Sequence, residues 1–200
     1  MRHLIVVAHP LEDSMTMALA RTYALELQAL GHAQVTRDLY RMNFNPVMAA
    51  NELEPLSIGR PPDMDVGQAQ ADLKAADVLI VAYPLWWATM PAMMKGYIDR
   101  VFARGFAYEA RAGVGRGLMV GKGCVLITLS GAPLQTMVNN GEWQAVQTLQ
   151  EAHIFRSSGF ELLAHLHFDE VEPPVSDEIV RRDRARVRAS ARRLFDAGTG

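Results

Sequence analysis

The chain has 200 residues, a formal net charge of −2 and a pI of about 6.3. Half of its residues are hydrophobic and 21% are charged, as expected of one packed globular domain spanning residues 1–200. The nearly balanced charge gives no electrostatic reason to expect nucleic acid as a partner.

The only cysteine, Cys124, excludes an intramolecular disulfide and, without paired Cys or His spacing, a structural zinc site. The apolar run at residues 4–8 is too short for the core of a signal peptide. The longest apolar stretch, residues 78–94, is interrupted by Pro84 and Pro91 and does not predict a membrane span. We therefore expect a cytoplasmic protein with no metal and no membrane insertion.

Strand and helix patterns alternate along the chain. In chain order they predict a strand (3–8), a helix (14–30), a strand (33–39), a proline-rich connection with about one helical turn (40–64), a helix (65–76), a strand (77–82), a helix (91–103), a glycine-rich surface excursion (105–121), a strand (124–129), a helix (142–155), a strand (160–168) and a terminal helix (176–195). This alternation predicts an α/β fold, a doubly wound five-stranded parallel sheet of order 2-1-3-4-5 with helices on both faces.

Such a sheet binds ligands beyond the carboxyl ends of its strands, where the strand order reverses. The loops after the first, third and fourth strands, at residues 8–16, 83–90 and 129–141, are therefore expected to converge. The composition of the chain is most unusual in these three loops.

The first loop joins a buried strand to a helix N-terminus. Free N–H groups there favour a phosphate, and Ser14 and Thr16 can add hydroxyl donors. The loop contains neither Gly-x-Gly-x-x-Gly nor the Walker glycine–lysine pair. An alternative is that Asp13 or Ser14 is only a helix N-cap.

The second loop contains two adjacent tryptophans, Trp86 and Trp87, between Pro84 and Pro91. Neighbouring residues point in different directions, so both cannot be core residues. A flat aromatic ligand would give one of them a stacking partner, while a hydrophobic dimer surface is the alternative. The two interpretations are compatible if the site lies at an interface.

The third loop reads Leu129-Ser130-Gly131-Ala132-Pro133. A small residue here would let backbone N–H groups approach the edge of a planar ring. N–H groups directed at that edge would stabilise negative charge on a reduced ring. A simple turn is the alternative.

Taken together, the sequence resembles the NAD(P)H:quinone oxidoreductase family, the flavodoxin-like group that includes DT-diaphorase, bacterial modulator-of-drug-activity quinone reductases and ancillary subunits of potassium-efflux systems. The likeness lies in residues 5–14 (IVVAHPLEDS), 38–46 (DLYRMNFNP), 76–108 (ADVLIVAYPLWWATMPAMMKGYIDRVFARGFAY) and 121–131 (GKGCVLITLSG). The third of these segments is the most specific.

The resemblance implies a homodimer with its site at the interface, a non-covalent flavin and a hydride relay. FAD is the first choice and FMN the second, with NADPH or NADH as donor and a quinone-like acceptor. The cofactor-binding residues that the loops and the resemblance together predict are His9, Ser14, Met15, Thr16, Pro84, Leu85, Trp86, Trp87, Ala88, Leu129, Ser130, Gly131 and Ala132. The predicted catalytic residues are Gly131, Trp87 and Tyr108, the last matching a tyrosine that reaches into the partner's site.

The chain departs from the family in the segment that supplies a proton. A tyrosine that members such as DT-diaphorase use near the flavin is matched by Met137. Residues 139–142 replace the histidine expected shortly afterwards. The family's relay is therefore not carried over, and solvent is one candidate proton source.

Three further patterns are given a structural interpretation. Seven arginines between residues 181 and 193 predict a solvated helix face, with the weaker possibility that one arginine reaches the adenine end of FAD. His165 and His167 share a face of one strand but do not make a metal site alone. The glycines at 113–117 neither follow a strand nor open a helix, and predict a flexible loop.

The sequence thus predicts a flavin-dependent NAD(P)H oxidoreductase that reduces quinones or similar acceptors in a ping-pong sequence. The alternative is a flavin-binding ancillary subunit of a potassium-efflux transporter, which the missing proton relay favours slightly. A one-electron carrier of the flavodoxin type is disfavoured because a net charge of −2 is low for that class.

Overall fold

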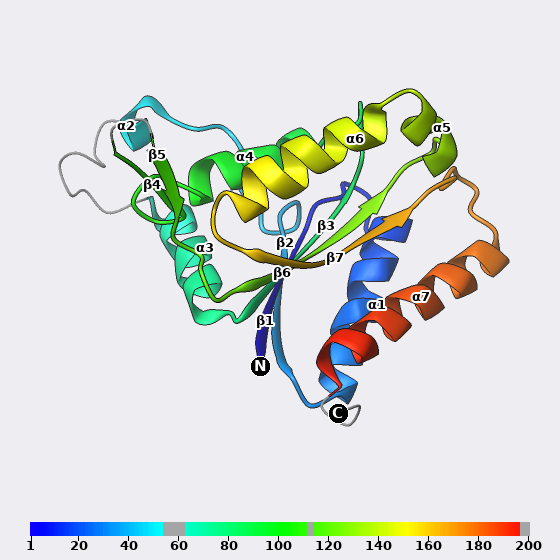
Figure 1. Cartoon of the computed structure of the whole chain (residues 1–200). Helices are drawn as coiled ribbons and strands as arrows, with labels where there is room; N and C mark the ends of the chain where they lie inside the picture. The colour runs from blue at the N-terminus through cyan, green and yellow to red at the C-terminus, as the bar shows by residue number, and fades with distance from the viewer. Residues whose placement is uncertain (54–62, 112–113, 197–200) are drawn as a thin grey trace.

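The computed structural model describes residues 1–53, 63–111 and 114–196. Its main sheet has five strands in the order β2-β1-β3-β6-β7, and every neighbouring pair is parallel (Figure 1). The strands are β1 (Arg2–Val7), β2 (Ala33–Asp38), β3 (Val78–Pro84), β6 (Gly123–Leu129) and β7 (Glu161–Phe168). Because β6 and β7 are the fourth and fifth strands of this sheet, the predicted order 2-1-3-4-5 is confirmed.

Helices cover both faces of the sheet, as predicted (Figure 1). One face packs against α1 (Met15–Ala29) and α7 (Asp177–Phe195). The other packs against α3 (Met64–Ala75), α4 (Ala92–Val101), α6 (Glu142–Val146) and the π-helical η2 (Gln147–Arg156). Two short helices, α2 (Ala50–Leu53) and α5 (Leu134–Asn139), lie in connections.

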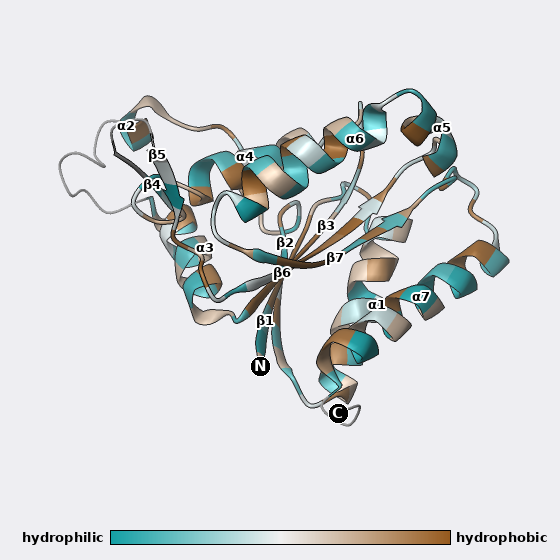
Figure 2. Cartoon of the chain, in the orientation of Figure 1, coloured by the Kyte–Doolittle hydropathy of each residue, from teal (hydrophilic) through white to brown (hydrophobic). Residues whose placement is uncertain are grey.

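The continuous apolar runs in the sequence are explained by burial on both faces of the sheet. In β1, Leu4 and Val6 belong to the core on the α3–α4 side, and Ile5 and Val7 belong to the core on the α1–α7 side. Figure 2 shows the resulting hydrophobic colour along the central strands. Alternate side chains of one strand therefore hold the two helix layers to the same sheet.

The glycine-rich excursion is more ordered than its sequence suggested. β4 (Tyr108–Arg111) and β5 (Val114–Gly117) form an antiparallel pair, so the prediction of a flexible loop at 113–117 is wrong for the described residues 114–117; Gly113 lies outside the described residues. A Cβ on Gly117 would lie 2.3 Å from the backbone nitrogen of Gly159. The glycine is needed because two backbone segments approach each other closely there.

The predicted helix at 142–155 is continuous but changes its winding. It begins as α6 and continues from Gln147 as η2, in which hydrogen bonds span five residues instead of four. Periodicity alone does not distinguish these windings, because both place apolar residues on one face. The π-helical part carries Gln150 and Glu151, two buried polar residues that face the sheet.

Candidate functional site

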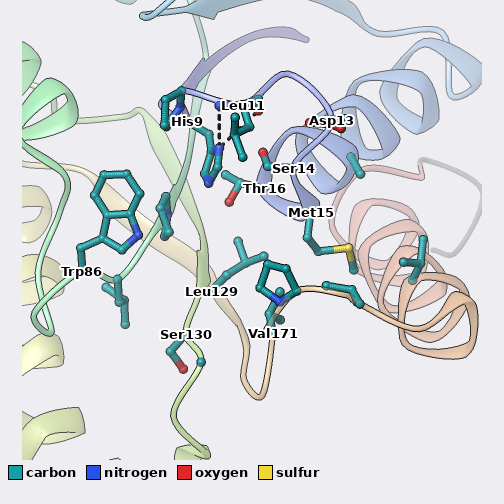
Figure 3. Close-up of a pocket in the computed structure, with 18 of the residues that line it drawn as sticks. His9, Leu11, Asp13, Ser14, Met15, Thr16, Trp86, Leu129, Ser130 and Val171 are labelled. Carbon is teal, nitrogen blue, oxygen red and sulfur yellow. Dashed lines mark hydrogen bonds between the residues drawn. The ribbon is translucent and has the colours of Figure 1, made fainter.

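A cavity of about 680 Å³ lies beyond the carboxyl ends of β1, β3 and β6, where the strand order reverses (Figure 3). Its walls come from the three predicted loops and from the segment that leads into α7. The predicted residues that line it are His9, Ser14, Met15, Thr16, Pro84, Leu85, Trp86, Leu129, Ser130 and Gly131. Residues far apart in the sequence therefore meet at one site.

The first loop ends in the N-terminus of α1. The Ser14 hydroxyl accepts a hydrogen bond from the Met17 N–H at 3.3 Å, so Ser14 is an N-cap as well as a lining residue. The N–H groups of Met15 and Thr16 have no acceptor within the helix, as is usual for a first turn. No acidic residue lies in that turn, whose partial positive charge favours an anion, although the Asp13 carboxylate just before the N-cap also lines the cavity.

Arg184 of α7 adds a full positive charge to this cavity. Its Nε is buried, and no hydrogen-bond partner for it exists among the described residues. An unpaired buried donor on a cation is costly unless an anionic ligand satisfies it. Arg184 and the α1 N-terminus together therefore suit a phosphate or diphosphate group.

His9 lies between the first and second loops. Its ring meets the Trp86 ring edge-on, with centroids 6.0 Å apart. Its Nδ1 accepts a hydrogen bond from the Leu11 N–H at 3.1 Å, drawn as a dashed line in Figure 3. Burial lowers the pKa of His9 and so favours the neutral ring, whose Nδ1 also lies 3.2 Å from the Leu11 carbonyl.

The second loop makes a tight turn in which Trp86 and Thr89 exchange backbone hydrogen bonds of 3.0 and 3.2 Å. Trp87 and Ala88 occupy the two central positions with φ values of 55° and 56°. Left-handed backbone costs about 1–2 kcal/mol for a residue with a Cβ, so this turn is strained. The turn places Trp86 at the cavity while Trp87 points outward, with 99% of its surface exposed.

The third loop presents backbone donors. Ser130 is fixed by its N–H to the Phe168 carbonyl at 3.0 Å and by its carbonyl to the Val171 N–H at 2.9 Å. The N–H groups of Gly131 and Ala132 have no acceptor in the described part of the chain. A Cβ on Gly131 would lie 3.0 Å from Oε1 of Glu172, so the glycine makes room for this carboxylate.

Four predicted residues lie away from the cavity within one chain. Trp87, Ala88 and Ala132 do not line it, although they belong to the converging loops. Tyr108 begins β4 and is 40% exposed. The catalytic roles of Trp87 and Tyr108 stay predictions, and for both they require a neighbouring chain.

Met137 is 2% exposed and packs into the core from α5. A thioether cannot donate a proton, so Met137 cannot take the role of the tyrosine that the family resemblance placed at this position. Among the described residues there is no cluster of three His, Cys, Asp or Glu side chains that could hold a metal. Within the same residues, no helix is long and apolar enough to cross a membrane.

The cavity also has an apolar wall that could not be predicted from the sequence, formed by Val171, Pro173, Val175 and Val180. These are ordinary apolar residues, and only the docking of α7 beside α1 brings them to the cavity. Arg184 had a signal in the arginine-rich helix, but nothing in the sequence distinguished it from its six neighbouring arginines.

A protein-family model described as "Flavodoxin-like fold" matches residues 1–191. An uncharacterised NAD(P)H oxidoreductase of Haemophilus influenzae is 41% identical over 123 residues, which cover 61% of this chain and 60% of that protein. NAD(P)H dehydrogenase (quinone) 1 of Rattus norvegicus is 30% identical over 185 residues, covering 81% of this chain and 66% of that protein.

Among solved structures, the NAD(P)H:quinone oxidoreductase of Methanothermobacter marburgensis superposes with a TM-score of 0.86 at 27% identity, covering 97% of this chain and 96% of that one. The alignments to the relatives from H. influenzae and R. norvegicus span slightly less than two thirds of their lengths. The match along residues 1–191, together with the sheet order and the cavity at its switch point, shows that this chain belongs to the flavodoxin-like family of the NAD(P)H:quinone oxidoreductases.

Proposed function

We propose that the chain is a flavin-dependent NAD(P)H oxidoreductase that reduces a quinone-like acceptor by two electrons. The observation that carries this proposal is the single cavity in which anion-binding groups, an aromatic wall and free backbone donors meet. The R. norvegicus and M. marburgensis relatives, whose names describe quinone reduction with NAD(P)H, support the same reaction class.

The residues of the cavity fit a flavin nucleotide. The α1 N-terminus, the Thr16 hydroxyl and the Arg184 guanidinium, whose buried Nε has no partner among the described residues, suit its phosphates. The apolar surfaces of Leu85 and Trp86 suit a flat tricyclic ring, for which aromatic contacts add about 0.5–1.5 kcal/mol beyond area burial. A bound flavin would supply hydride transfer from the nicotinamide and onward transfer of two electrons.

The chain's own residues would set the geometry and the electrostatics of that chemistry. The N–H of Gly131, which lines the cavity and has no acceptor in the described part of the chain, would face the ring edge and stabilise negative charge there, as in an oxyanion hole. His9, whose lowered pKa favours a neutral ring, can take part in hydrogen bonding without adding charge. Leu129 and Pro84 would exclude water from the inner side of the ring.

We infer FAD as the cofactor, with FMN as the second choice. The cavity extends past the α1 N-terminus to Arg184 and Val180 on α7, which leaves room and a positive charge for a second phosphate and its nucleoside. FMN would leave that end of the cavity unfilled and the Nε of Arg184 unpaired. The volume of about 680 Å³ lies within the usual range for cofactor sites.

We also propose that the active form is a homodimer of one-domain chains. Trp87, 99% exposed on a strained turn, and Tyr108, 40% exposed on the hairpin, would complete the partner's substrate site. Exposed aromatic residues at a rim are typical of protein interfaces.

The test is to purify the protein and identify any bound flavin by its absorbance and by mass spectrometry. NADPH or NADH should bleach the yellow colour, and a quinone should restore it. A colourless protein that neither binds added FAD or FMN nor oxidises NAD(P)H would refute the proposal. Sedimentation of the purified protein would test the dimer separately.

A further inference from the structure

A row of hydrogen-bonded side chains runs along the sheet face beneath η2. Oε1 of Glu151 lies 2.8 Å from Nδ1 of His165, whose Nε2 lies 2.7 Å from the Thr128 hydroxyl. The same hydroxyl lies 2.9 Å from Nδ1 of His167. Thr128 and His167 face each other across the β6–β7 pair, so the register of these strands creates the row.

The row ends at the cavity. Nε2 of His167 lies 3.1 Å from the Ser130 hydroxyl, which donates to the Ala132 carbonyl at 2.8 Å. Ser130 lines the cavity. A continuous path of five hydrogen bonds therefore joins the buried Glu151 to the candidate active site.

The number of hydrogen bonds requires one proton more than the neutral side chains of this path supply. Its two ends, a carboxylate and a carbonyl, can only accept, so five hydrogen bonds need five protons from the groups between them. Two hydroxyls and two neutral imidazoles supply four. One of the two histidines must therefore be an imidazolium when all five bonds are made.

The extra proton belongs on His165. Burial lowers the pKa of His167 to about 4, which keeps that ring neutral. The hydrogen bond from His165 lowers the pKa of Glu151 and so favours a carboxylate beside the imidazolium. With the extra proton on His165, each group from His165 to Ser130 donates its hydrogen bond to the next group in the direction of the cavity.

The surroundings isolate the path. The Trp143 ring packs on both imidazoles, with centroids 5.0 Å from His165 and 4.7 Å from His167. Arg156 on η2 contacts Glu151 at 3.5 Å and is half exposed, which marks the solvent end. The other charged groups that act on His167 are Asp169, which follows β7, and Arg186 on α7.

We propose that Glu151, His165, Thr128, His167 and Ser130 form a proton relay that delivers one proton to an acceptor held in the cavity. The inference rests on the proposed function. Reduction of a quinone by NAD(P)H consumes one proton, giving a hydroquinone and NAD(P)⁺. The Ser130 O–H turns from the Ala132 carbonyl and transfers this proton to the acceptor. The Nε2 proton of His167 then passes to Ser130, the Thr128 hydroxyl proton passes to Nδ1 of His167, and the extra proton of His165 passes to Thr128. The starting state returns when the proton of His167 moves from Nδ1 to Nε2, both hydroxyls turn back, and solvent near Arg156 supplies one proton to His165.

Ser130 is the only member of this relay that reaches the cavity, so the other four are positioning residues that act through it. The relay residues would supply a proton to the reacting acceptor, which Met137 and residues 139–142 cannot do. The relay lies on β6, the residue that follows it, β7 and η2, whereas Met137 lies on α5.

The test variant is Thr128→Val, which removes the central hydroxyl and keeps the side-chain shape. Three hydrogen bonds then remain with three protons available, so the imidazolium is no longer required. The matched control is Thr22→Val, which removes a buried hydroxyl that donates to the Ala18 carbonyl at 2.7 Å, away from the relay. Melting temperatures of both variants verify that they are folded.

The first readout needs no turnover. Nitrogen-15 NMR of the ring nitrogens at pH 7 should show one buried histidine with both nitrogens protonated in the wild type and in Thr22→Val. In Thr128→Val this signal should be absent. Two neutral rings in the wild type, or an unchanged imidazolium in Thr128→Val, would overturn the relay.

The second readout separates the two half-reactions by rapid mixing of the flavin-loaded protein. The step with NAD(P)H should keep its wild-type rate in Thr128→Val, because no relayed proton is consumed there. The step with quinone should slow by at least about tenfold and lose its solvent deuterium isotope effect. A wild-type rate for the quinone step would refute the relay, whereas a wild-type protein that NAD(P)H cannot reduce would refute the proposed function itself.

Discussion

The guanidinium of Arg41 donates a hydrogen bond of 2.7 Å to the backbone carbonyl of His9. A second bond of 2.8 Å runs to the Pro10 carbonyl, and Asp38 pairs with Arg41 at 3.6 Å. Arg41 does not line the cavity, yet it fixes the loop that does. The segment after β2 therefore contributes to the site by holding the first loop in place.

Replacing Arg41 by lysine should weaken flavin binding about tenfold, which corresponds to about 1.4 kcal/mol. A lysine ammonium cannot reproduce the planar fork that reaches two adjacent carbonyls. The dissociation constant is measured by titrating the apoprotein with FAD. Arg21→Lys is the control, because Arg21 makes only an exposed ion pair with Glu12. Equal affinities of the Arg41 variant and the wild type would contradict the role given to this arginine.

Much of the fold could be predicted because the central strands leave little ambiguity. In β3 every residue from Val78 to Pro84 is buried. A short, continuous apolar run of this kind fits a strand buried on both faces better than a helix with one apolar face. The site followed from the same reasoning, since parallel strands end at one edge and their loops must meet there. For this reason the sequence alone predicts that His9, Trp86 and Gly131 lie at one site.

What could not be predicted depends on contacts between elements. Only the position of α7 beside α1 selects Arg184 from seven similar residues. The row from Glu151 to Ser130 requires the register that places Thr128 opposite His167, and periodicity gives no register. The hairpin was missed because glycines that permit close backbone approach look the same in sequence as glycines in a flexible loop.

Gly117→Ala should lower the free energy of unfolding by about 1–3 kcal/mol, the usual cost of overpacking. The new Cβ would lie 2.3 Å from backbone atoms of Ser158 and Gly159, which cannot move as a flexible side chain can. Gly115→Ala is the control, since nothing lies within 4 Å of its Cβ position. Urea denaturation measures both variants, and equal midpoints would show that the hairpin does not pack as described.

Acidification should destabilise the fold through His3. Burial lowers the pKa of His3 to about 4, against an ordinary value of 6.5, and the neighbouring His32 acts in the same direction. Because the unfolded chain binds a proton more readily, the stability present above pH 6.5 falls progressively toward pH 4. The loss attributable to His3 is about 3 kcal/mol, because the two pKa values differ by about 2.5 and each pKa unit corresponds to 1.36 kcal/mol.

The measurement is the free energy of unfolding at several pH values between 4 and 7. His3→Gln should have a shallower slope than the wild type, although His167, with a pKa also near 4, preserves part of it. His153→Gln, at an exposed helix position, should keep the wild-type slope. An unchanged slope in His3→Gln would rule out His3 as the titrating group.

Trp87→Ala should change the stability of the single chain by less than about 0.5 kcal/mol, because the side chain is 99% exposed. If Trp87 meets a partner chain, the same variant should raise the dimer dissociation constant or the KM for quinone at least about tenfold. Val120→Ala, at another exposed apolar residue, should change neither. Wild-type association and kinetics in Trp87→Ala would remove this residue from the proposed site.

Arg184→Gln should separate FAD from FMN as the ligand of the cavity. The variant removes the charge and the two terminal nitrogens of the guanidinium, and leaves a shorter, neutral amide near the position of the buried Nε. We expect FAD binding to weaken about ten- to a hundredfold, since a charge-assisted hydrogen bond contributes about 1.5–3 kcal/mol. FMN binding should change less if its one phosphate is held by the α1 N-terminus alone.

The control variant is Arg188→Gln, which removes the same net charge at an exposed position of the same helix. Calorimetric titration of each variant with FAD and with FMN gives the four affinities that are compared. A loss for FMN as large as that for FAD would place Arg184 at the first phosphate and would favour FMN as the cofactor.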